Sequence, residues 1–229
     1  NHTPVIDQMA REGIRFTDFY VTSGVCTPSR ASLLTGCYPR RVSMHVDQNN
    51  KWVLFPSAKK GLNPDETTIA EILKKQNYTT ACIGKWHLGD SEPLRPHRQG
   101  FDTTYYINKS NNQTKTIWRG DEVVEKPFEN RLLTEQFTTE AVRFIKTNKS
   151  KPFFLYLPFT APHFPVQSHP DWKGKSAFRV EGAKAKVRDY GDVVEELDHR
   201  IGEILNTLKT EKLDQNTIVI FLSDNGPQG

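Results

Sequence analysis

The amino-acid sequence predicts an α/β fold, a doubly wound and mostly parallel β-sheet with helices on both faces. Helical patterns of apolar residues alternate along the chain with short segments rich in β-branched and aromatic residues. Residues 153–159 form a nearly continuous apolar run, which is typical of a strand buried on both faces at the centre of a parallel sheet. Polar residues suited to chemistry come directly after predicted strands, where ligands bind in open α/β sheets.

The predicted strands are short segments bounded by turn residues. They comprise residues 14–21, 78–84, 101–107, 153–159 and 217–222, together with a small hairpin of residues 116–118 and 122–124 around Gly120 and Asp121. Between them we expect helices over residues 3–13, 28–35, 69–73, 134–146 and 187–208. The last is the strongest, because its apolar residues keep a helical spacing throughout. Residues 38–63 contain prolines and polar residues and are expected to be irregular.

Size and composition indicate a soluble globular protein. The chain has 229 residues, of which 36% are hydrophobic and 25% charged, and a net charge of +4. No apolar run reaches the roughly 18 residues of a membrane span, and no nucleic-acid-binding signature accompanies the short basic clusters. The three cysteines make no disulfide framework. We therefore expect neither a membrane span nor a nucleic-acid partner.

A short segment around Cys26 carries the first candidate chemistry. Cys26 lies just before a predicted helix, with Pro28 suited to the first helical position and Gly36 to the position past its end. Backbone N–H groups and the helix dipole favour negative charge there, and Arg30 follows about one turn later. Cys26 therefore suits a nucleophile for an anionic substrate, although a cysteine before a proline is more often structural.

Further candidates follow three other predicted strands. Lys85 and His87 lie two residues apart in Gly-Lys-Trp-His-Leu-Gly, so in an extended segment both reach the same side. His163 lies between two prolines, which restrain its backbone. Asp224 and Asn225 offer the hard oxygen ligands of Ca²⁺ or Mg²⁺. Taken alone, Lys85 and His87 would more often be a surface lysine and a satisfied histidine, and Asp224 with Asn225 more often a turn. His163 alone would equally be a packed loop histidine.

Together these motifs resemble the formylglycine-dependent (type I) sulfatases of the alkaline phosphatase superfamily. Cys-Thr-Pro-Ser-Arg with the following Leu-Leu-Thr-Gly is similar to the sulfatase signature, whose core is Cys-x-Pro-x-Arg. Gly-Lys-Trp-His-Leu-Gly and Ser-Asp-Asn-Gly are similar to two further motifs of the family, and all occur in the family's order. The resemblance covers the chain from near its start to its last residues, and implies a sulfuric ester hydrolase.

The resemblance implies a cofactor pair at this site. Cys26 would be oxidised to Cα-formylglycine by a formylglycine-generating enzyme. One hydroxyl of the aldehyde hydrate would attack sulfur and release the alcohol, and the other would then expel sulfate and restore the aldehyde. A divalent cation, Ca²⁺ or else Mg²⁺, would be held by Asp224, Asn225 and the group derived from Cys26.

The resemblance also implies roles for the charged residues. Arg30 would steady the hydrate and the metal site, and Lys85 would contact the sulfate. His87 would hold or deprotonate the diol. His163 would contact the sulfate and act as acid for the leaving group.

The same resemblance implies an incomplete site. A complete sulfatase has an aspartate pair after its first strand and a further lysine downstream, and neither region is in this chain. We therefore expect residues 1–229 to be a partial sulfatase catalytic domain, incomplete at both ends and short of metal ligands when isolated. The expected location is periplasmic or secreted, or else lysosomal or extracellular. The expected substrates are sugar or aryl sulfates, selected by loops such as residues 109–126 and 167–186.

Two other functions stay open. The first is a phosphate or phosphonate ester hydrolase of the same superfamily, which would share the formylglycine and metal site. The second is a non-catalytic module that binds sulfated glycans through a degenerate site. The rates on matching sulfate and phosphate esters would distinguish the phosphorus ester hydrolase from a sulfatase. Conversion of Cys26 to formylglycine would distinguish a sulfatase from the binding module.

Overall fold

The computed structural model of the protein describes residues 1–178 and 189–227. The chain forms two compact units, which are considered separately. The sheet unit comprises Phe19–Pro127, Ser150–Pro158 and Val219–Gly229. The helical unit comprises Asn1–Asp18, Phe128–Lys149 and Phe159–Ile218.

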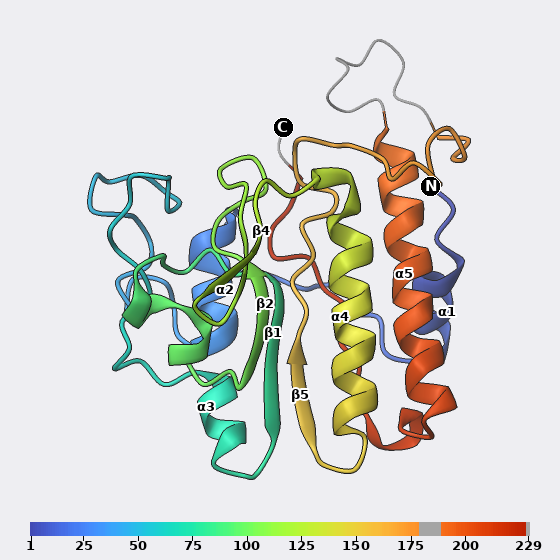
Figure 1. Ribbon diagram of the computed structural model, residues 1–229, viewed down its shortest axis with the longest axis horizontal. Coiled ribbons are helices and arrows are strands. Elements are labelled where there is room, and N and C mark those ends of the chain that lie inside the picture. The colour runs from blue at the N-terminus through green and yellow to red at the C-terminus, as the bar shows by residue number, and fades with distance from the viewer. Residues whose placement is uncertain (179–188, 228–229) are drawn as a thin grey trace. The chain divides into compact units, whose positions relative to one another are not determined.

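The sheet unit contains a five-stranded sheet in the order β4-β3-β2-β1-β5 (Figure 1). Its strands are β1 (Thr79–Lys85), β2 (Thr103–Ile107), β3 (Ile117–Arg119), β4 (Glu122–Glu125) and β5 (Phe153–Tyr156). Strand β1 is parallel to both β2 and β5, whereas β3 and β4 extend the β2 edge as an antiparallel hairpin. The predicted α/β class, with a mixed and mostly parallel sheet, is confirmed, and so is the predicted hairpin.

Strand β1 is the central strand of this sheet. Every residue of β1 after Thr79 is buried, because the strand has a neighbour on each side. Beyond its end, the buried Trp86 contacts Phe101 edge-on at 6.0 Å between ring centroids, and its Nε1 donates to the carbonyl of Leu94 at 2.9 Å. The end of β1 is therefore firmly held at the point where the candidate residues follow.

Gly84 allows a close approach at the same end of β1. Its φ is +132°, and an added Cβ would lie 2.3 Å from the carbonyl oxygen of Pro158. The next residue, Lys85, donates its backbone N–H to that carbonyl at 2.8 Å. A side chain at position 84 would push apart the two segments of the chain that this hydrogen bond joins.

Three predicted strands differ in the structure. Residues 14–21 and 217–222 have no strand partner among the described residues, and Ile14 and Ile218 are 84% and 89% exposed. The run predicted to be a central strand over 153–159 forms only the four-residue β5, which is half-buried at the end of the strand order. The reason is shared: apolar residues form a fully buried strand only where neighbouring strands supply a ladder and a packing surface.

Two helices of the sheet unit, α2 (Cys26–Thr35) and α3 (Ile69–Lys74), lie next to each other beside β1 (Figure 1). Helix α3 begins at a capping box, in which the Thr68 hydroxyl accepts the Glu71 N–H at 3.2 Å and the Glu71 carboxylate accepts the Thr68 N–H at 2.7 Å. Two single 3₁₀ turns follow β1, η1 (Glu92–Leu94) and η2 (Pro96–Arg98). The helix predicted over residues 69–73 is confirmed, as is the irregular course of residues 38–63.

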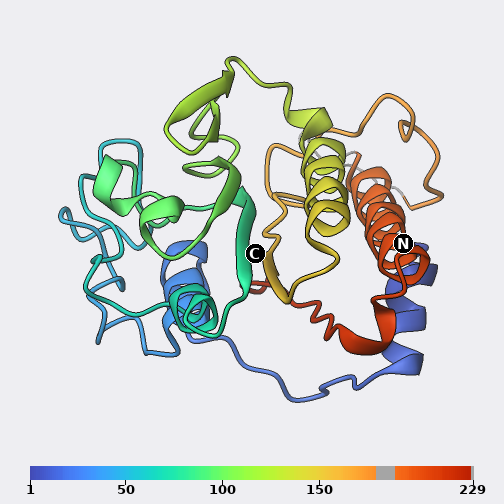
Figure 2. The same cartoon turned by 60° about the horizontal axis from the view of Figure 1, so that its bottom comes forward.

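The helical unit is built from α1 (Pro4–Glu12), α4 (Leu133–Asn148) and α5 (Tyr190–Thr210), with short 3₁₀ turns at Asn130–Leu132 and Asp214–Asn216. Helices α4 and α5 pack along their length, and α1 packs against α5 (Figure 2). The three predicted helices are confirmed within the described residues, which exclude residues 187 and 188 at the start of the last one. None of the described helices combines the length and apolar character that a bilayer crossing requires.

Candidate active site

Helix α2 presents Cys26 at its first residue. The preceding Val25 is extended, with φ −139° and ψ 154°, and the helix ends at Gly36, whose φ of +68° is left-handed. The Gly36 N–H closes the last turn on the carbonyl of Ser32 at 2.8 Å. The thiol is partly exposed, as a reacting group must be. The predicted placement of Cys26 at a helix start is thus found.

His87 faces this thiol. Its Nδ1 lies 3.4 Å from Cys26 Sγ, and its Nε2 lies 2.9 Å from the carbonyl oxygen of Leu54. Because a carbonyl only accepts hydrogen bonds, Nε2 carries a proton, and in the neutral imidazole Nδ1 then carries the lone pair. His87 is therefore oriented to take a proton from a group at position 26.

Arg30 and Lys85 form the positive side of the site, and both are buried. Arg30 donates to the backbone carbonyl of Lys85 at 2.7 Å and forms an ion pair with Asp224 at 2.7 Å. Burial lowers the pKa of Arg30, but the charges of Tyr156, Asp224 and Cys26 raise it by a larger amount. The net pKa therefore lies above its ordinary value. The guanidinium is a permanent charge.

The pKa of Lys85 moves the other way. Burial and the positive charge of Arg30 lower the pKa of Lys85 to about 8, against the opposing influence of Cys26 and Asp224. The Lys85 amine therefore titrates close to neutral pH. An anion that enters the site would favour its charged form.

Asp224 is anchored at the site, while Asn225 is not seen to touch it. Ser29 donates its hydroxyl to the backbone carbonyl of Asp224, and Arg30 binds the Asp224 carboxylate. The Asn225 amide instead donates to the carbonyl of Gly226 at 2.9 Å. Their carboxylate and amide oxygens are the donors that Ca²⁺ and Mg²⁺ prefer, so the chemistry fits such an ion, but Ca²⁺ takes about six to eight oxygens. These two residues alone would supply only part of such a coordination shell.

His163 belongs to the helical unit. Its backbone N–H donates to the Thr160 carbonyl at 2.7 Å, and its Nδ1 lies 2.6 Å from the carbonyl of Phe164. The carbonyl makes Nδ1 the protonated nitrogen, which leaves Nε2 to interact elsewhere. A role for His163 beside Cys26 stays a prediction.

The structure adds residues that the sequence analysis missed. Ser110 is buried after β2, with its hydroxyl 3.5 Å from His87 Nδ1, and the Tyr156 hydroxyl lies 3.5 Å from Arg30. A polar run directly after a predicted strand was the available signal for Ser110. The Leu54 carbonyl gave no signal, since it is a backbone group in an irregular segment.

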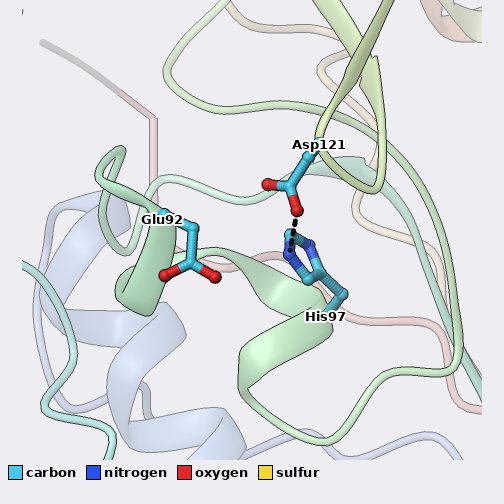
Figure 3. Close-up of side chains that lie close together, drawn as sticks. All are labelled: Glu92, His97 and Asp121. Atoms are coloured by element: carbon cyan, nitrogen blue, oxygen red, sulfur yellow. Dashed lines mark ion pairs between the residues drawn. The ribbon is translucent and has the colours of Figure 1, made fainter.

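A second group of possible metal ligands, Glu92, His97 and Asp121, lies elsewhere in the sheet unit (Figure 3). One ligand atom from each lies within 4.8 Å of the others, with His97 Nε2 3.2 Å from Asp121. However, Arg95 binds the Asp121 carboxylate at 2.6 Å and Arg98 binds that of Glu92. These arginines neutralise both carboxylates, so we interpret the group as an ion-pair network that ties the β3–β4 turn to the 3₁₀ turns.

Comparison with known proteins identifies the family of the chain. The family model described as Sulfatase matches residues 1–229, so the chain belongs to the sulfatase family. It is 33% identical to an arylsulfatase of Hemicentrotus pulcherrimus over 97% of the chain and 42% of that protein. It is 35% identical to the N-acetylgalactosamine-6-sulfatase of Mus musculus over 98% of the chain and 45% of that protein.

A solved structure from work on glycosaminoglycan metabolism by Bacteroides thetaiotaomicron has the same fold. It superposes with a TM-score of 0.84 at 28% identity, over 98% of this chain and 57% of that one. The chain thus spans less than half the length of the curated relatives named above.

Proposed function

We propose that residues 1–229 form part of the catalytic domain of a sulfuric ester hydrolase that cleaves sugar or aryl sulfates. The observation that carries this proposal is the 3.4 Å contact between Cys26, at a helix start, and the unprotonated Nδ1 of the buried His87. Family membership supports the reaction class. The names of the relatives, an arylsulfatase and an N-acetylgalactosamine-6-sulfatase, support the substrate class.

The reacting group of the proposal is Cα-formylglycine, made from Cys26 by a formylglycine-generating enzyme. When present, its hydrate supplies two hydroxyls on one carbon, a nucleophile and a means of releasing sulfate afterwards. The Cys-Thr-Pro-Ser-Arg motif and the partial exposure of Cys26 support this conversion. We further propose Ca²⁺, with Mg²⁺ as the alternative, held in part by Asp224, Asn225 and the modified residue 26.

His87 is the proposed base. Its Nε2–H is held by the Leu54 carbonyl, so Nδ1 meets the group at position 26 as an acceptor. The proton that Nδ1 takes increases the negative charge on the attacking oxygen. Burial of the imidazole keeps water from competing for this nitrogen.

Arg30 and Lys85 are the proposed binding groups for the ester. Both lie buried at the end of β1 and carry positive charge at neutral pH, because this pH is below the Lys85 pKa of about 8. Fixed cations in a dry site stabilise the charge that develops on the sulfate oxygens. Arg30 also orients the Asp224 carboxylate. His163 is proposed as the acid for the leaving alcohol.

The proposed substrate class suggests a location. Sulfated glycans lie outside the cytosol, so we propose a periplasmic, secreted or lysosomal enzyme. The sugar would be selected by loops such as residues 109–126, of which Lys109, Ser110 and Asn111 are buried next to β2. Residues 179–186 of the other expected loop lie outside the described residues.

A substrate comparison tests the proposed reaction. The full-length protein, produced with a formylglycine-generating enzyme, is assayed on a fluorogenic aryl sulfate and on the matching phosphate monoester, diester and phosphonate. We expect the sulfate to be hydrolysed fastest. Faster hydrolysis of a phosphorus ester would favour the related hydrolase, and binding of sulfated glycan without turnover would favour the binding module.

Loss of the base should be measurable separately. Because general base catalysis contributes about 10²- to 10⁴-fold, we expect His87→Gln to lower kcat by at least about 100-fold. The exposed His199 on α5 pairs with Glu203 in its own helix and its ring lies 5.2 Å from that of Trp172. It offers a control, since His199→Gln should leave kcat unchanged. Equal kcat in both variants would contradict the role given to His87.

A further inference from the structure

The hydroxyl of Thr27 forms a buried bridge behind the proposed base. It donates to the backbone carbonyl of His87 at 3.2 Å and accepts the backbone N–H of Leu54 at 3.3 Å. Thr27, Leu54 and His87 are 2%, 3% and 1% exposed. A hydroxyl has one donor and two acceptor sites, so both bonds form at once.

The bridge closes a ring of hydrogen bonds. Leu54 uses its N–H toward Thr27 and its carbonyl toward His87 Nε2, at 2.9 Å. Thr27 therefore holds the residue whose carbonyl decides which nitrogen of His87 carries the proton.

The backbone of His87 needs this support. Its φ of +58° lies in the left-handed region, which disfavours residues other than glycine and persists only where neighbours hold it. Its N–H donates to the Asn108 carbonyl at 3.2 Å, and its carbonyl is held by Thr27. Thr27 secures the second of these two peptide groups.

We propose that Thr27 is a positioning residue that holds His87 with its Nδ1 lone pair toward position 26. The inference rests on the proposed function for its catalytic meaning, because a base is needed only if residue 26 reacts. Thr27 directly follows Cys26, so one short segment supplies both the reacting group and the hydroxyl that orients its base.

The test compares Thr27→Val, which keeps the shape and removes the hydroxyl, with Thr27→Ser, which restores it. Both are made in the full-length protein produced with a formylglycine-generating enzyme. Since Thr27 lies inside the modification motif, kcat is divided by the converted fraction, measured by mass spectrometry. We expect Thr27→Val to lower this corrected kcat about 10- to 100-fold, with a much smaller change in KM, and Thr27→Ser to recover most of it.

Thr35 is a matched control on the same helix. Its hydroxyl also joins two backbone groups, donating to the Ala31 carbonyl at 2.8 Å and accepting the Cys37 N–H at 3.3 Å. Thr35→Val therefore makes the same chemical change without touching His87. We expect it to leave the corrected kcat unchanged.

A readout that needs no turnover separates this proposal from the proposed function. Nitrogen NMR of ¹⁵N-histidine-labelled protein reports the tautomer of His87, whose signal is identified by its loss in His87→Gln. We expect a protonated Nε2 in the parent protein, in Thr27→Ser and in Thr35→Val, and a mixture of tautomers in Thr27→Val. An unchanged tautomer and an unchanged corrected kcat in Thr27→Val would overturn the proposal. A fully converted but inactive parent protein would overturn the proposed function alone, and the NMR comparison would still decide the role of Thr27.

Discussion

At the scale of single residues, Lys85 links the chemistry of the site to pH. Burial of its amine and the nearby positive charge of Arg30 together lower the pKa of Lys85 from 10.5 to about 8. The amine is therefore charged below about pH 8 and neutral above it. The proposed contact of Lys85 with sulfate needs the charged form, so we expect the affinity for sulfate to decrease as the pH rises through this range.

Inhibition by inorganic sulfate measures this effect. We expect the inhibition constant of the full-length enzyme to increase several-fold from pH 7 to pH 9. In Lys85→Met, sulfate should bind more weakly at pH 7, and the step near pH 8 should be absent. A step of the same size in Lys85→Met would assign the titration to another group.

The sequence predicted the charged residues of the site better than the contacts that orient them. Cys26, Arg30, Lys85, His87 and Asp224 were expected together, because motifs after neighbouring strands meet at one edge of a sheet, and the structure joins them through short contacts. The pairing of His87 with the Leu54 carbonyl was not predictable. A backbone group in an irregular segment has no sequence signal, and its position depends on the packing of the whole unit.

At the scale of elements, α1 depends on a carboxylate from α5. The buried Asp198 accepts the backbone N–H groups of Val5 and Ile6 at 3.1 and 2.8 Å, in the first turn of α1. The side chain of Thr3, the residue before the helix, makes no capping bond. Asp198 thus does the work of an N-cap from a distant part of the chain.

Removal of this cap should be costly. We expect Asp198→Ala to lower the free energy of unfolding by about 1–3 kcal/mol, since two partly buried N–H groups lose their acceptor. The neighbouring His199 is exposed, and His199→Ala should change the free energy of unfolding by less than about 0.5 kcal/mol. Urea denaturation followed by circular dichroism gives both values. Equal values for the two variants would show that Asp198 does not stabilise α1.

Elements were predictable where their signals are local. The capping box at Thr68, the end of α2 at Gly36 and the turn of the β3–β4 hairpin each depend on residues close in sequence. The strands expected over 14–21 and 217–222 depend on a partner strand, which the residue pattern does not specify. Their apolar character was correctly identified, but their pairing was not.

At the scale of the molecule, the described chain forms a sheet unit and a helical unit. The sheet unit contains Cys26, Arg30, Lys85, His87 and Asp224, so the proposed nucleophile, base and anion-binding groups share one folded body. His163 is in the helical unit. The α/β class was predictable because the alternation of helices and strands is a property of the whole sequence.

Conversion of Cys26 is the central claim of this account. The full-length protein is produced in cells that contain a formylglycine-generating enzyme and is digested with trypsin, and the mass of the peptide of residues 16–30 is measured. The account predicts the mass of a formylglycine residue at position 26, present in the parent protein and absent from Cys26→Ala, which also lacks turnover. An unmodified thiol at Cys26 throughout the sample, or turnover by Cys26→Ala, would contradict it.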